Sequence, residues 1–236
     1  MLRVNRILSL RVLLLGLLLL LPQSGLAGQE RYAGLDQLDL SQLLAPPPAA
    51  DSARQKKEIA ELLALQAKRT PAQAAFAKAD EERSLIRFGI MFGPGFTADK
   101  LPNAVAFFEK VNKQGDELTQ AVKKLWGRPR PFVTNPAITP CVTKPSSASY
   151  PSGHTVFATV TGVLLANMVP EKRAEIFERA HQFGLNRMIG GVHYPSDVAA
   201  GRVAGTVIAA FLMQDAEFKA EFDRAKAEIR GVLGLH

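Results

Sequence analysis

The most constraining feature of the chain is a 15-residue segment, Thr155 to Val169, that is apolar on nearly every side and stops at Pro170. A helix that is apolar all round is normally buried, whereas a helix that crosses a membrane needs about 20 residues. The segment therefore predicts a buried central helix, which other helices of the chain must surround.

Apolar residues in the flanking segments recur at spacings of three and four, as in helices with one buried face. The other expected helices open at Ser52, Thr70 and Thr97, or cover 171–183, 195–213 and 215–230. The helix opening at Thr70 is expected to run toward Phe92, and Gly127 to end the next one. No alternating run is convincing as a strand, so the sequence predicts an all-α fold, a single compact helical bundle of about seven helices over residues 51–236.

The N-terminus has the order of a secretory signal. Arg3, Arg6 and Arg11 precede an apolar stretch at 12–21, and small residues precede a cleavage position after Ala27. An uncleaved membrane anchor is the alternative, but the apolar run is short for a span. Residues 1–27 are therefore expected to be a signal peptide, and the mature protein, without a membrane span, to be periplasmic or secreted.

Residues 28–50 are turn-rich and contain the run Pro46-Pro47-Pro48, which is typical of an extended arm laid against a domain. Removing the three signal arginines from the 29 basic residues leaves 26, against 22 acidic residues. This excess of four favours small anionic ligands as much as nucleic acid, and no nucleic-acid partner is expected. The single cysteine, Cys141, excludes a disulfide framework within the chain, and a homo-oligomer stays open.

The first of three polar motifs joins Lys123 to Arg130-Pro131 across six intervening residues. Lys123 falls in the last turn of an expected helix, and the prolines keep the following segment extended. Both cations can therefore point into one cleft. Lysine also favours helix C-termini for electrostatic reasons, so the motif alone is compatible with a structural role.

The second motif is Pro151-Ser152-Gly153-His154, immediately before the central helix. Ser152 is a natural N-cap, and Gly153 lets a ligand approach the backbone closely. The free N–H groups of a helix N-terminus favour an anion, with His154 beside it. A capped helix with an incidental histidine explains the motif equally well.

The third motif is Arg187, five residues, His193, three residues, Asp197. Pro195 is expected to begin the next helix, which puts Asp197 in its first turn. From there the carboxylate can turn back toward His193 and fix its tautomer through the Nδ1 proton. A first-turn acid and a loop histidine are also common without any function.

The three motifs together suit one chemistry. They supply three cations, two neutral donors and two histidines that can serve as nucleophile and acid: Lys123, Arg130, Arg187, Ser152, Gly153, His193 and His154. A phosphoryl group in transfer spreads charge over three equatorial oxygens and needs donors around them, with reacting groups at both ends. Because no acidic cluster accompanies the two histidines, no metal site and no cofactor are expected.

The three motifs in this order resemble the signature of the type 2 phosphatidic acid phosphatase superfamily, which also includes the vanadium-dependent haloperoxidases. Within it the chain is most similar to the class A bacterial nonspecific acid phosphatases, from about Leu44 to the charged terminal helix. The resemblance implies an exported, metal-independent acid phosphatase that hydrolyses phosphomonoesters through a phosphohistidine intermediate and releases inorganic phosphate. Two departures concern the substrate. Asn186 replaces the Ser of the motif, with an amide that can substitute, and the segment 191–195 is closer to the lipid phosphatase branch.

The resemblance also implies a role for each site residue. His193 attacks phosphorus, Asp197 orients it, and His154 protonates the leaving oxygen. The phosphoryl oxygens are held by Lys123, Arg130, Ser152, Gly153 and Arg187. Vanadate is expected to inhibit, because its trigonal-bipyramidal form matches the transition state.

Three other functions stay open on the sequence alone: a lipid phosphate or pyrophosphate phosphatase, a vanadium-dependent haloperoxidase, and a non-catalytic anion-binding protein. The last of these needs the cations but has no use for the pair formed by His193 and Asp197. The charged runs 56–58 and 80–83 are expected to be solvated helix faces.

Overall fold

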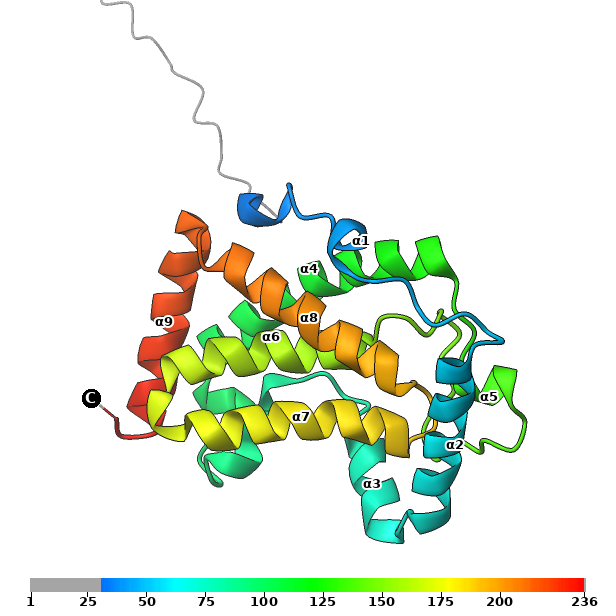
Figure 1. The fold of residues 1–236 in the computed structure, drawn as a ribbon. Helices are drawn as coiled ribbons and strands as arrows, with labels where there is room; N and C mark the ends of the chain where they lie inside the picture. The colour runs from blue at the N-terminus through cyan, green and yellow to red at the C-terminus, as the bar shows by residue number, and fades with distance from the viewer. Residues whose placement is uncertain (1–30, 236) are drawn as a thin grey trace, which may run out of the picture. The chain divides into compact units, whose positions relative to one another are not determined.

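The structure is a computed structural model that describes residues 31–235, and the expected signal peptide lies outside these residues. Nine α-helices are assigned within them (Figure 1): α1 (Leu40–Leu43), α2 (Ala53–Lys68), α3 (Pro71–Ala79), α4 (Pro102–Trp126), α5 (Pro131–Thr134), α6 (Gly153–Met168), α7 (Arg173–Ile189), α8 (Pro195–Leu212) and α9 (Ala216–Val232). Seven have nine residues or more, and residues 31–235 contain no strand. The all-α prediction is confirmed.

The expected central helix is α6, and most of its side chains are buried. It packs mainly against α7 and α8, and α4 also contacts it (Figure 1). Most of the core is one apolar cluster, in which α6 residues such as Leu164 and Leu165 meet aromatic side chains including Phe88 and Phe183. Burial of this helix follows directly from its apolar composition.

Local signals in the sequence fix several helix ends. The Ser52 hydroxyl accepts a hydrogen bond from the Gln55 backbone N–H (3.1 Å) at the start of α2. Thr70 and Gln73 form a reciprocal capping box at the start of α3. Gly127 ends α4 in the left-handed region at φ 54°, where glycine meets no steric penalty.

Other boundaries differ from the expectation. The helix that opens at Thr70 ends at Ala79 rather than near Phe92, and residues 85–91 form a separate 3₁₀ helix. In the other direction, α7 continues through Gly184 to Ile189, so Arg187 lies on a helix rather than in a loop. The segment expected to be an extended arm includes short helical turns at 33–35 and in α1.

Helices α6 and α8 approach so closely that glycine is needed between them. A Cβ atom at Gly205 would lie 2.7 Å from the Thr159 Cβ and 2.9 Å from the Val156 carbonyl oxygen. We expect Gly205→Ala to lower the free energy of unfolding by about 1–3 kcal/mol, because a packed interior cannot absorb the methyl group. Gly231→Ala on α9 is the control, since nothing lies within 4 Å of its Cβ position. Chemical denaturation checks both variants, and equal stability of the two would contradict the close packing.

No single helix among residues 31–235 has the length and apolar composition needed to cross a bilayer. Helices α8 and α9 meet those criteria only as a pair, bent by 101°.

Candidate active site

The predicted site residues meet at one end of α4 and α6, around a pocket of about 120 Å³. Five of the eight line it directly: Lys123, Arg130, Gly153, His154 and His193. The other three are buried: Ser152, Arg187 and Asp197. Arg83 and Asp116, which the sequence did not single out, complete part of the rim and form an ion pair there (2.7 Å).

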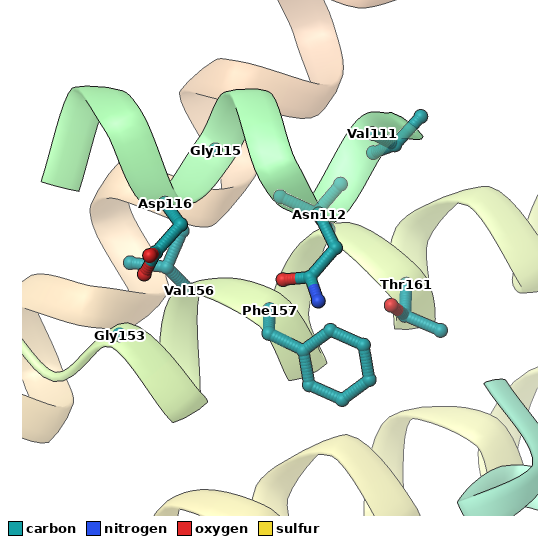
Figure 2. A pocket seen from close by; sticks show the side chains of 9 residues that line it. Val111, Asn112, Gly115, Asp116, Gly153, Val156, Phe157 and Thr161 are labelled. Carbon is teal, nitrogen blue, oxygen red and sulfur yellow. The ribbon is translucent and has the colours of Figure 1, made fainter. Parts of the chain in front are cut away.

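Gly153 and Asp116 line both this pocket and a second, mostly apolar one. Figure 2 shows the second pocket, in which Asp116 of α4 and Gly153 at the start of α6 lie beside Val156 and Phe157. A Cβ atom at Gly153 would make only ordinary contacts, the nearest 3.6 Å from the Asp116 carboxylate. The protein itself therefore does not demand glycine here, which is consistent with a position kept open for a ligand.

The loop between α7 and α8 holds His193 in one tautomer. Its Nδ1 lies 3.2 Å from the Asp197 Oδ2, and its Nε2 lies 2.8 Å from the Arg130 Nη1. A guanidinium can only donate, so Nε2 must accept and the proton must be on Nδ1, donated to the carboxylate. The lone pair of Nε2 therefore points toward Arg130, which lines the pocket.

Burial, together with the cations around it, keeps His193 neutral. Burial lowers its pKa well below the ordinary value, and Arg130, Lys123 and Arg187 lower it further. A neutral imidazole is the form that can act as a nucleophile or base.

Asp197 sits in the first turn of α8, as the sequence predicted, and is fully buried. Its Oδ2 accepts from the Ser149 hydroxyl (2.5 Å) and the Tyr194 backbone N–H (2.9 Å), besides His193. Its Oδ1 accepts from the Arg128 Nη1 (2.5 Å). Burial raises the pKa of Asp197, and these donors, Arg128 first, oppose that rise. The donors therefore favour the carboxylate form that accepts the Nδ1 proton of His193.

His154 occupies the first turn of α6 and also faces the pocket. Its Nε2 lies 3.0 Å from the Glu81 carbonyl oxygen, so Nε2 carries the proton that is donated. Nδ1 is then the nitrogen that gains or releases a proton. Burial, followed by the charge of Arg187, lowers the pKa of His154 well below its usual range. A bound dianion would raise that pKa and favour the protonated ring.

Lys123 lies in the last turn of α4 with its ammonium group buried against the following loop. Nζ donates to the backbone oxygens of Ala148 (2.6 Å) and Ser149 (3.3 Å). Burial lowers the pKa of Lys123 to about 7, and nearby Arg130 contributes. Asp197 and Asp116 oppose this shift only in part, so an anion bound in the pocket would further stabilise the charged form.

Arg187 is a buried cation at the end of α7, with 1% of its surface exposed. Its Nε and Nη1 have no hydrogen-bond partner among residues 31–235. Burial lowers its pKa to about 10, so the guanidinium stays charged at neutral pH. A buried charge with free donors is costly unless an anion binds to it, and Arg187 also acts electrostatically on both His154 and His193.

Ser152 plays a local part in the described structure. Its hydroxyl accepts from the Thr155 backbone N–H (3.3 Å) and the Thr155 hydroxyl (2.9 Å), which makes it the N-cap of α6. Its backbone N–H donates to the Asp197 carbonyl oxygen (3.0 Å). Ser152 therefore ties the start of α6 to the start of α8.

Asn186 does not offer its amide to the pocket, contrary to the expectation from the sequence. Its Nδ2 donates to Asp80 (2.7 Å), and its Oδ1 accepts from Gln182 (2.7 Å). Asp80 also binds Arg87 and Arg179 and is fully buried. The expected solvated run 80–83 is thus wrong at its first residue, because one side chain of the following 3₁₀ helix and two of α7 satisfy that carboxylate.

Sequence reasoning also missed Arg128 and Glu58. Arg128 was read only as part of an extended segment, and Glu58 as part of an exposed face. Both are buried and paired, with the Arg128 Nη2 donating to the Glu58 Oε2 (2.8 Å). The buried Leu62, one helical turn after Glu58, was a signal that this face of α2 turns inward.

No three His, Cys, Asp or Glu side chains in residues 31–235 are grouped so as to hold a metal ion.

Comparison with known sequences identifies a domain within the chain. Residues 114–220, which hold all three motifs, match the PAP2 superfamily, and the chain therefore contains a PAP2 superfamily domain. It is 29% identical over 197 residues to an acid phosphatase of Zymomonas mobilis, covering 79% of this chain and 74% of that protein. It is 33% identical over 123 residues to a non-specific acid phosphatase of Providencia stuartii, covering 50% of this chain and 49% of that one.

A non-specific acid phosphatase of Salmonella typhimurium is 36% identical over 116 residues, 47% of this chain and 46% of that protein. The chain thus aligns with about half the length of the Providencia and Salmonella relatives. Among solved structures, a bacterial vanadium-dependent iodoperoxidase matches with a TM-score of 0.58 at 19% identity, covering 72% of this chain and 52% of that one. That likeness shows a shared fold.

Proposed function

We propose that the protein is an acid phosphatase that hydrolyses phosphomonoesters through a phosphohistidine intermediate. The observation that carries the proposal is the orientation of His193, whose Nδ1 is directed at Asp197 while its Nε2 accepts from Arg130 in the pocket. The family match and the acid phosphatase relatives support it.

The first chemical step forms a bond between the His193 Nε2 and phosphorus and breaks the bond from phosphorus to the ester oxygen. The phosphoryl oxygens are held by Lys123, Arg130, Arg187 and the start of α6 at Ser152 and Gly153. The fold already holds these cations around the pocket, and Arg130 gives up its hydrogen bond to the His193 Nε2 when it binds the phosphoryl group, which frees the lone pair for attack. Asp197 stabilises the positive charge that develops on the imidazole.

His154 supplies the proton to the leaving oxygen from Nδ1. The pKa of this imidazole is low when the pocket holds no anion, and a phosphate dianion raises it. After the alcohol departs, the now neutral ring takes a proton from water, which attacks phosphorus and breaks the N–P bond. Inorganic phosphate and free enzyme result.

The basic, apolar and small-residue order of residues 1–27, which lie outside the described residues, supports export to the periplasm or beyond, with cleavage near Ala27. The partners of the site are then a small phosphomonoester, inorganic phosphate and, as an inhibitor, vanadate.

We expect hydrolysis of a chromogenic phosphomonoester to continue undiminished in excess chelator, because organic cations supply all of the charge stabilisation in the proposed step. Orthovanadate should inhibit competitively, since it mimics the transition state and can bind to the same cations as the phosphoryl group. The measurement is initial rate against substrate concentration with EDTA, with EDTA plus added Mg²⁺ or Zn²⁺, and with vanadate. Activity that needs added metal, or turnover unchanged at vanadate far above the substrate concentration, would contradict the proposal.

A further inference from the structure

Arg128 is buried between the carboxylates of Glu58 and Asp197, which are far apart in the sequence. Its Nη1 donates to the Asp197 Oδ1 (2.5 Å), and its Nη2 donates to the Glu58 Oε2 (2.8 Å). Its guanidinium also lies over the Tyr194 ring, 3.9 Å from the centroid. Only 5% of Arg128 is exposed, so these contacts are made away from solvent.

Glu58 also forms hydrogen bonds to the residue next to Asp197. Its two oxygens accept from the Ser196 backbone N–H (3.1 Å) and the Ser196 hydroxyl (2.8 Å). Ser196 is the residue before Asp197 in the first turn of α8. Helix α2, which precedes the matched PAP2 segment, therefore contacts the turn that carries the Asp197 carboxylate.

These contacts form one continuous chain of charged groups that ends at the imidazole. It runs from the Glu58 carboxylate to the Arg128 guanidinium, then to Asp197, and from its other oxygen to the His193 Nδ1. Buried hydrogen bonds between charged groups are short and strong, and each polarises the next. A change of charge at Glu58 or Arg128 therefore alters the electrostatic potential at Asp197 and His193.

We propose that Glu58 and Arg128 are positioning residues that together set the ionisation of Asp197 and hold His193 in the tautomer whose Nε2 is unprotonated. This inference rests on the proposed function for its catalytic meaning. Arg128 favours the carboxylate form of Asp197, and the negative charge of Glu58 offsets part of that influence. The pair thus holds the proton on His193 Nδ1 rather than on the carboxylate.

Removal of each partner should move the titration of the His193 and Asp197 pair in opposite directions. Without the cation at Arg128, the pair binds a proton more readily, so its pKa rises. Without the negative charge at Glu58, the pair binds a proton less readily, so its pKa falls. The other charged or titratable groups that act on the two residues are unchanged in both variants: Arg130, Lys123, Arg187 and His154.

The test uses ¹⁵N NMR of the histidine side chains in the full mature chain, with His193 assigned from a His193→Ala sample. In the wild type we expect the signature of an Nδ1–H tautomer. Arg128→Gln should raise the pH of the His193 transition by about 1–3 units, as for loss of a close opposite charge. Glu58→Gln should lower it by about 0.5–1 unit, because the Glu58 charge lies beyond the Arg128 guanidinium and is therefore farther from Asp197 and His193. Glu61→Gln, the same substitution at an exposed position of α2, should leave it unchanged.

Activity gives a second readout that a merely structural role would not move. The acid limb of kcat/KM should shift in the same directions as the NMR transition. The inhibition constant of inorganic phosphate should stay within about two-fold, because neither residue lines the pocket. Arg128→Gln leaves two carboxylates buried without their cation and is expected to lower stability. If it does not fold, the Glu58→Gln comparison with Glu61→Gln decides the question.

A wild-type His193 in the Nε2–H tautomer, shifts of the same sign, or no difference between Glu58→Gln and Glu61→Gln would overturn the proposal. A wild-type chain that shows the tautomer and the opposite shifts but hydrolyses no phosphomonoester would overturn the proposed function and leave the positioning role supported.

Discussion

His193→Ala is expected to abolish turnover of every phosphomonoester, with a loss of at least about 10⁴-fold in kcat. The proposed first step needs the lone pair of Nε2, and among residues 31–235 no other imidazole that lines the pocket has a carboxylate partner. Loss of an enzyme nucleophile typically lowers kcat by this factor or more, because the residues that remain in the site can bind the substrate but cannot attack it. The cations that hold phosphate are retained in the variant, so the affinity for inorganic phosphate should change little.

Steady-state rates with an aryl and an alkyl phosphate measure the loss. His181→Ala is the matched control, since His181 is exposed on α7, lies 2.7 Å from Arg202 and does not line this pocket. A His193→Ala variant that keeps more than a few per cent of the wild-type rate would show that another group attacks phosphorus.

His154→Ala is expected to divide substrates by their leaving groups. An alkoxide leaves poorly and needs the proton that His154 supplies, whereas a nitrophenolate leaves without it. General acid catalysis is worth about 10²- to 10⁴-fold, so the loss of kcat/KM should be larger by that order for the alkyl phosphate than for the nitrophenyl ester. The kcat/KM of both esters in wild type and variant gives the answer.

The same variant should accumulate phosphoenzyme with the nitrophenyl ester. The second step uses neutral His154 as the base for water, and its removal slows hydrolysis of the N–P bond while the first step proceeds. A burst of nitrophenolate equal to the enzyme concentration is the expected signature. Equal losses on both esters and no burst would contradict the assignment of His154.

The fold was predictable where the pattern is local and strong. The central helix 155–169 is apolar all round, and the caps at Ser52 and Thr70 mark true helix starts. The prediction failed where tertiary contacts override a local signal. Gly184 lies inside α7 because its close packing against Val198 and Thr155 leaves no room for a side chain, so the glycine marks a helix contact rather than a helix end.

The candidate site was predictable to the extent that its residues stand in spaced motifs. Five predicted residues share one pocket, and the placement of Asp197 in a first turn followed from Pro195. Glu58 and Asp80 were expected to be exposed, because charged residues are seldom fully buried unless they are paired. Their partners, Arg128 and Arg179, lie 70 and 99 residues away along the chain, and only the folded structure brings such pairs together.

The central claim is that a phosphoryl group passes through His193, and the most direct test is to locate that group. His154→Ala is mixed with a nitrophenyl phosphate, quenched within milliseconds in alkaline denaturant to preserve a phosphoramidate, and digested for peptide mass spectrometry. We predict one phosphoryl group per chain on the peptide that contains His193, located on that residue, and none in the His193→Ala/His154→Ala double variant. A burst of product with no phosphoryl group on His193, or with the group on another residue, would contradict it.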